Sequence, residues 1–142
     1  MKKILILLFL ATLMACQSKN HKESSRAMVS PEVVVYYLHQ PKGCPSCKAM
    51  GSISKATTEK YFQKELKEGR LAYFDLDISK AENDTIAKKF ECSWAGLYVL
   101  YKKKGKEHAQ DLTGEGFMYS VPRPDTLELI IKNSITEKLQ NL

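Results

Sequence analysis

Short apolar runs predict four β-strands in this chain. Val33–Leu38 is a continuous β-branched and aromatic run, which is typical of a central strand covered on both faces. The segment 71–78 alternates, and it predicts a strand with Ala72, Phe74, Leu76 and Ile78 on one face and Asp75 and Asp77 on the other. Gly96–Tyr101 predicts a third strand, and a lysine-rich hairpin turn at 102–106 leads to a weaker fourth strand around His108–Leu112.

Residues at spacings of three and four predict the helices. From Cys44 to about Leu66 the composition is compatible with one helix, which ends near Gly69. Asn83 or Asp84 can cap a short second helix. The closing helix begins at about Asp125, where Asp125 and Glu128 have capping-box spacing, and its apolar stripe comprises Leu127, Ile130, Ile131, Ile135 and Leu139.

The order of these segments predicts the fold class. A strand, a helix and a second strand form a βαβ unit with parallel strands, and the late hairpin adds an antiparallel pair. We therefore expect an α/β domain with a central mixed β-sheet flanked by helices.

The first residues have the pattern of an export signal. A basic start at Met1–Lys3 precedes the apolar run Ile4–Leu13, which is too short to span a bilayer, and small Ala15 lies directly before Cys16. This segment resembles the lipobox of bacterial lipoproteins. The alternative is an ordinary signal peptide, or a buried helix, with an incidental cysteine.

The lipobox resemblance implies a division of the chain and a location. Residues 1–15 would be a removed lipoprotein signal peptide, 16–31 a lipidated flexible tether and 32–142 the folded domain. Cys16 would carry a diacylglycerol and, in many bacteria, a third acyl chain, which together anchor a protein stably. The domain would then lie in the bacterial cell envelope, outside the cytoplasm, on the inner or outer membrane.

The basic charge of the chain, which would suit a nucleic-acid partner, lies mostly in the residues before Glu32. The chain has 22 basic and 16 acidic residues, a net charge of +6. From Glu32 onward 17 basic residues face 15 acidic ones, so we expect no nucleic-acid partner. The basic tether either lies near anionic lipid head groups or is simply a soluble spacer.

Two of the four cysteines form a Cys-x-x-Cys motif. Cys44 and Cys47 lie at the start of the predicted first helix, where this spacing brings both sulfurs within bridging distance. The helix amino terminus, with Lys42 and Lys48 nearby, would stabilise a thiolate on Cys44. Cys44 would attack a substrate disulfide and Cys47 would resolve the mixed disulfide. The alternative is a pair of unreactive cysteines or half of a zinc site.

With this motif at the first strand-to-helix junction, residues 33–139 resemble a thioredoxin-like domain. More narrowly, the stretches Tyr36–His39, Cys44–Cys47 and Ala87–Phe90 are similar to the small thioredoxin-like family labelled ArsF, named as a subunit of a nitrophenyl compound nitroreductase system. The resemblance implies a partner that is a protein disulfide or dithiol, or a membrane electron donor. No flavin or nicotinamide fingerprint occurs, and we expect no cofactor.

The chain departs from the thioredoxin pattern at three places. Gly43 replaces the aromatic residue before the first cysteine, and Ala95 or Gly96 stands where the cis-proline belongs. The first strand also lacks the buried acid that assists the resolving cysteine. These departures alter the expected substrate platform.

Three further residues are candidate auxiliaries. Cys92 is either a buried core residue or a third thiolate, in which case Cys44, Cys47 and Cys92 could bind Cu(I), Zn(II) or As(III). His39 could be a fourth ligand, could stabilise the Cys44 thiolate or could be solvated. Trp94 could replace the missing aromatic wall or serve packing. The prediction is a thiol–disulfide oxidoreductase, with a metal or metalloid binding module and a non-catalytic scaffold as alternatives.

Overall fold

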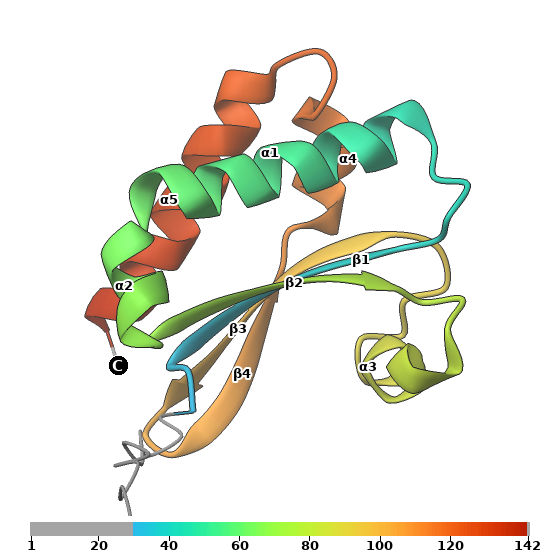
Figure 1. Ribbon diagram of the computed structural model, residues 1–142. Helices are drawn as coiled ribbons and strands as arrows, with labels where there is room; N and C mark the ends of the chain where they lie inside the picture. Colours follow the sequence, from blue (N-terminus) through green and yellow to red (C-terminus); the bar gives the residue numbers. More distant parts are fainter. Residues whose placement is uncertain (1–29, 142) are drawn as a thin grey trace, which may run out of the picture.

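The computed structural model describes residues 30–141 (Figure 1). In chain order the elements are β1 (Val33–His39), α1 (Pro45–Tyr61), α2 (Gln63–Glu68), β2 (Leu71–Asp77), the 3₁₀ turn η1 (Ala81–Asn83), α3 (Asp84–Lys89), β3 (Gly96–Lys103), β4 (Lys106–Asp111), α4 (Thr113–Tyr119) and α5 (Pro124–Gln140). The predicted signal peptide, Cys16 and most of the tether lie outside the described residues.

The four strands form one mixed sheet in the order β2-β1-β3-β4. β1 lies parallel to β2 and antiparallel to β3, and β3 lies antiparallel to β4. As its continuous apolar run predicts, β1 is an inner strand and five of its seven residues are buried. The predicted α/β class and mixed sheet are confirmed, and the arrangement is that of a thioredoxin-like fold.

Alternate side chains of β1 enter two separate apolar clusters. Val33, Val35 and Tyr37 belong to the main core, between the sheet and the layer that contains α1 and α5. Leu38, with Tyr36 packed beside it, belongs to a second cluster on the opposite face, where α3 lies (Figure 1). The two faces of the sheet therefore have different environments.

The first predicted helix is divided at Phe62. This residue ends α1 with φ −127° and ψ 31°, outside the helical region, and α2 begins directly after it. The Phe62 ring is buried in the main core. As predicted, Gly69 ends this helical region, and it does so in the left-handed conformation with φ 74°.

The helix α4 was not predicted, because its sequence contains two glycines and no apolar stripe. Tertiary contacts hold it in place instead. The Thr113 hydroxyl accepts a hydrogen bond from the Leu97 amide at 3.0 Å, and Gly116 packs closely against Met50. Leu112, directly before the helix, is buried in the main core.

The two predicted faces of β2 are confirmed, since Leu76 and Ile78 pack against the second cluster and the exposed Phe74 ring stacks on Tyr36. The face with the aspartates is not only polar, because Leu71 is buried there and Tyr73 packs against the main core.

One predicted detail is wrong. Asp125 and Glu128 do not form a capping box, since Arg123 is the N-cap of α5 and Glu128 instead bonds Lys60 at 2.7 Å.

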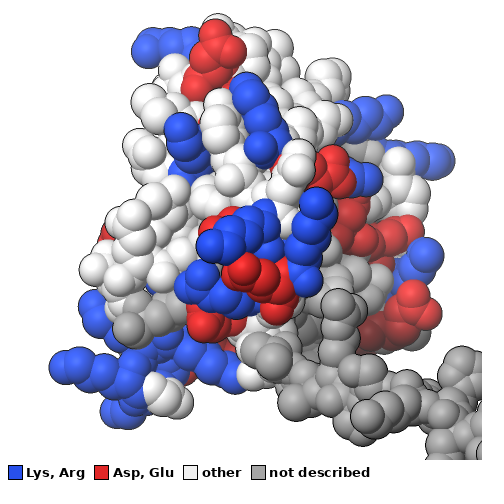
Figure 2. Space-filling view, turned by 60° about the vertical axis from the view of Figure 1, so that its left-hand side comes forward, with Lys and Arg blue, Asp and Glu red and all other residues white. Residues whose placement is uncertain are grey.

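Charged side chains of both signs share the surface. On the face shown in Figure 2, acidic side chains lie among basic ones over the middle, and basic side chains alone gather at the lower left. None of the helices in residues 30–141 combines the length and the apolar character needed to cross a bilayer.

Gly51 offers a test of the packing between β1 and α1. A Cβ atom there would overlap the Tyr37 ring, so we expect Gly51→Ala to lower the free energy of unfolding by about 1–3 kcal/mol. Gly114→Ala is the matched control, because a Cβ at Gly114 would have no atom within 4 Å. Urea denaturation measures both variants, and a Gly51→Ala protein as stable as wild type would contradict this packing.

Candidate redox site

The local sequence around the motif starts α1 and places both sulfurs at its first turn. Cys44 is the N-cap, with extended backbone at φ −67° and ψ 165°, and its sulfur accepts a hydrogen bond from the Cys47 amide at 3.2 Å. Pro45 occupies the first helical turn, where its missing N–H is not needed. Cys44 and Cys47 are joined as a disulfide with their Cα atoms 5.0 Å apart.

The two cysteines differ in exposure. Cys47 is fully buried in the main core, whereas Cys44 is partly buried and packs against the edge of that core. A partner approaching from solvent therefore reaches the Cys44 sulfur first. This is the arrangement expected from the motif, and it identifies the pair as a thiol module with unequal members.

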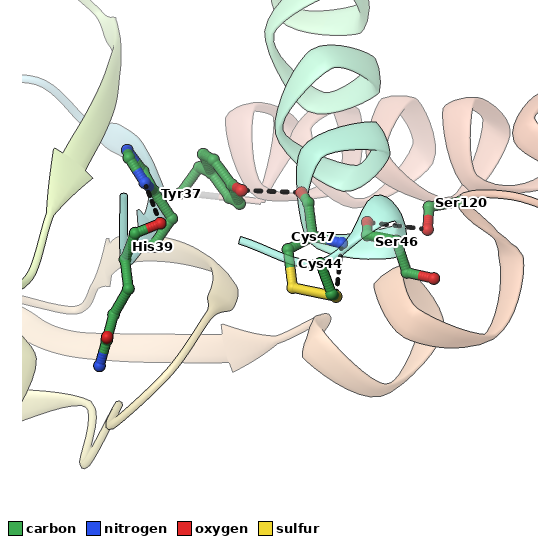
Figure 3. Close-up of a disulfide and its surroundings, with 7 residues drawn as sticks. Tyr37, His39, Cys44, Ser46, Cys47 and Ser120 are labelled. Atoms are coloured by element: carbon green, nitrogen blue, oxygen red, sulfur yellow. Dashed lines mark hydrogen bonds between the residues drawn. A yellow bond between two sulfur atoms is a disulfide. The ribbon is translucent and has the colours of Figure 1, made fainter. Parts of the chain in front are cut away.

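Tyr37 connects β1 to the buried cysteine (Figure 3). Its hydroxyl donates to the Cys47 carbonyl at 2.7 Å, and its ring lies where Gly51 has no side chain. From the adjacent strand, the Tyr73 hydroxyl donates to the Gly51 carbonyl at 3.3 Å. Burial, and next the charge of Asp75, raises the pKa of Tyr37 to about 12, so this hydroxyl is a donor at neutral pH.

His39 lies at the end of β1, beside Tyr37. Its Nε2 atom is 3.0 Å from Asp75 Oδ1, its Nδ1 atom is 3.1 Å from the Gln40 carbonyl, and its ring stacks on Tyr37 with 5.2 Å between centroids. Asp75 lies on β2 opposite Tyr37 in the sheet register, and its side chain is exposed. The acidic positions on β2 were visible in the sequence, but their place beside His39 depends on strand register.

A hollow of about 300 Å³ lies between α1 and the ends of β1 and β2. Its lining includes Tyr37, His39, Gly43, Lys48, Lys55 and Asp75. Gly43, directly before Cys44, therefore borders the hollow where an aromatic residue was expected from the thioredoxin pattern. The side of the redox pair nearest β2 is polar and open to solvent.

On the other side, the end of α4 contacts the motif itself. The Ser120 hydroxyl donates to the carbonyl of Ser46, between the two cysteines, at 3.1 Å (Figure 3). Sequence reasoning missed this contact because the two serines are 74 residues apart.

The structure does not bring Cys92 to the redox pair. Cys92 is free and buried in the second cluster with Leu38 and Tyr98, whereas Cys47 lies in the main core. The sheet separates the two clusters, so the alternative three-thiolate site does not form and Cys92 is the buried core residue that the sequence allowed. No group of three or more His, Cys, Asp or Glu residues within 30–141 could hold a metal ion.

Trp94 and Ala95 occupy the loop before β3. Ala95 is buried in the same core as Cys47, whereas Trp94 is 50% exposed, which favours a surface role over packing. Gln40 holds this loop through a 2.9 Å hydrogen bond to the Ser93 carbonyl. No cis peptide bond occurs among the described residues.

Comparison with known proteins adds little. No protein-family model matches the chain, and no curated protein matches it. A solved structure described as that of a malarial protein is 18% identical, with a TM-score of 0.38 over 63% of this chain and 92% of that one. A likeness this slight carries no argument about fold or function.

Tyr37→Phe tests the link between β1 and the first turn of α1. The variant keeps the ring but loses the hydrogen bond to Cys47, so we expect the free energy of unfolding to fall by about 0.5–1.5 kcal/mol. Tyr101→Phe, on β3, removes a hydroxyl with no hydrogen bond to another described side chain and should change little. Equal stability of the two variants in urea would contradict the link.

The same variant has a distinct pH dependence. The pKa of Tyr37 is raised from 10.0 to about 12, so its stabilising effect is full below pH 10 and is lost as pH rises to about 12. Urea midpoints should therefore decline less steeply with pH in Tyr37→Phe than in wild type. Parallel profiles would show that Tyr37 titrates alike in the folded and unfolded chains.

Proposed function

We propose that this chain is a thiol–disulfide oxidoreductase of the bacterial cell envelope, anchored through lipid on Cys16 and acting through Cys44 and Cys47. The observation that carries the activity is the Cys44–Cys47 pair at a helix amino terminus, with one sulfur accessible and the other buried. The lipobox-like sequence before Cys16 supports the anchor.

The reaction in the reducing direction has two exchanges. The Cys44 thiolate forms a bond to one sulfur of the partner's disulfide, and the other partner sulfur leaves with the electron pair of the broken bond. Cys47 then loses its proton to solvent and bonds to Cys44, which releases the second partner sulfur as a thiolate. The protein dithiol loses two electrons, and the partner disulfide becomes two thiols after protonation.

The surroundings of Cys44 favour this chemistry. A helix amino terminus stabilises negative charge, and no acidic residue lies between Gln40 and Thr58 to oppose a thiolate, whereas Lys42 and Lys48 flank the motif. The Cys47 amide that now bonds the Cys44 sulfur is a hydrogen-bond donor suited to the thiolate.

Cysteine variants test the roles of the two sulfurs. We expect the wild-type domain to catalyse reduction of insulin by dithiothreitol, Cys44→Ser to abolish catalysis, and Cys47→Ser to accumulate mixed disulfides that resist resolution. Cys92→Ala is the control and should retain activity, because Cys92 lies across the sheet. Failure of Cys44 and Cys47 to interconvert reversibly at about −200 to −270 mV would refute the proposal.

Cys16→Ala tests the anchor separately. In a bacterial host we expect wild type to sediment with membranes and to carry an acyl-modified amino-terminal peptide in mass spectrometry, because two or more acyl chains bind bilayers stably. The variant should lose both properties and keep its insulin reduction. An unmodified amino terminus in wild type would count against lipidation and leave the redox assignment standing.

A further inference from the structure

The redox pair lies between two surfaces of opposite character. The polar hollow is bordered by residues of β1, β2 and α1, whereas α4 contacts β3, α1 and α5. Because the sheet order is β2-β1-β3-β4, the hollow and α4 lie on opposite sides of the first turn of α1. A protein whose sulfur reaches Cys44 therefore meets both surfaces.

The α4 side is apolar. Of the seven large apolar side chains exposed within residues 30–141, three lie on α4 or directly after it: Phe117 at 39%, Met118 at 62% and Val121 at 57%. They are within about one helical turn of Ser120, whose hydroxyl bonds the motif. Exposed apolar side chains that cluster in this way mark interaction surfaces, whereas scattered ones do not.

The opposite side is basic. Lys48 and Lys55 are exposed and line the hollow seven residues apart, on one face of α1. The one carboxylate in the lining, Asp75, is paired with His39. Two lysines against this one carboxylate give the hollow a positive net charge, which complements an acidic partner.

From this arrangement we infer the partner, given the proposed activity: an extended protein segment whose cysteine has acidic residues on one side and apolar residues on the other. Its apolar side chains cover Phe117, Met118 and Val121, and its carboxylates face Lys48 and Lys55. This places the partner's sulfur over Cys44 and leaves Cys47 enclosed until the second exchange.

Peptide probes test this partner directly. Four short peptides each contain one cysteine, which is joined in a mixed disulfide to thionitrobenzoate. On one side of the cysteine the residues are acidic or basic, and on the other side they are leucines or serines, which gives the four combinations. The Cys44 thiolate bonds to the peptide sulfur and thionitrobenzoate leaves with the electron pair. Cys47 then gives up its proton, bonds to Cys44 and releases the peptide thiolate, so the reduced protein is the two-electron donor.

Preferences between peptides are compared within each protein variant, so that altered thiol reactivity cancels. We expect reduced wild type to react at least about threefold faster with acidic than with basic peptides, and with leucine than with serine peptides. Lys48→Glu should reverse the charge preference, and Met118→Ser should diminish the leucine preference. Added salt should weaken only the charge preference.

Matched controls lie elsewhere on the surface. Leu129→Ser alters an exposed apolar residue of α5, and Lys103→Glu reverses an exposed lysine at the far end of β3. Both should keep the wild-type preferences. The inferred partner is wrong if wild type shows neither the charge preference nor the leucine preference. It is equally wrong if these preferences are unchanged in Lys48→Glu and Met118→Ser.

The two proposals fail in distinguishable ways. Titration of the wild-type disulfide with dithiothreitol reports the redox pair without any peptide. If the disulfide titrates reversibly but no peptide is preferred, only the inferred partner is refuted. If the disulfide is not reduced reversibly, both the oxidoreductase proposal and the inferred partner are refuted.

Discussion

Hydrogen bonds from two tyrosine hydroxyls connect α1 to the sheet, and the positions of both sulfurs depend on them. The Tyr37 ring packs against α1 at Gly51, and its hydroxyl donates to the Cys47 carbonyl. The Tyr73 hydroxyl, from the neighbouring strand, donates to the Gly51 carbonyl. A helix is rigid over this length, so anchoring its first two turns orients the N-cap sulfur as well. Ser120 holds the same turn from α4, which leaves Cys44 at the surface and Cys47 inside.

Side chains that alternate along β1 lie on opposite faces of the sheet, so the side chains near the cysteine pair are separated from those that only pack. Tyr37 and His39 point to the α1 face and take part in the site, whereas Tyr36 and Leu38 pack into the second cluster with Cys92. A thiol on the far side of the sheet cannot exchange with Cys44 without disrupting that cluster. The thiol module therefore contains two cysteines, although the described residues include three.

Other groups occupy the places where this chain departs from the thioredoxin pattern. Gly43, without an aromatic side chain, borders a hollow containing the His39–Asp75 pair. Trp94 is exposed next to Ala95, in the loop where a cis-proline was expected. The helix α4, which the sequence did not predict, contributes exposed apolar side chains beside the motif. The approach to Cys44 is consequently polar on one side and apolar on the other.

The sequence alone determined the strands, the sheet class and the start of α1, because these follow from local periodicity and from Pro45 after an N-capping cysteine. It also identified the Cys44–Cys47 pair, because the spacing of these two residues on a helix fixes their separation. Only the tertiary structure decided that Asp75 meets His39, that Cys92 lies apart and that α4 exists. Those outcomes depend on strand register, on which side of the sheet each cluster occupies and on contacts between distant residues, none of which local patterns encode.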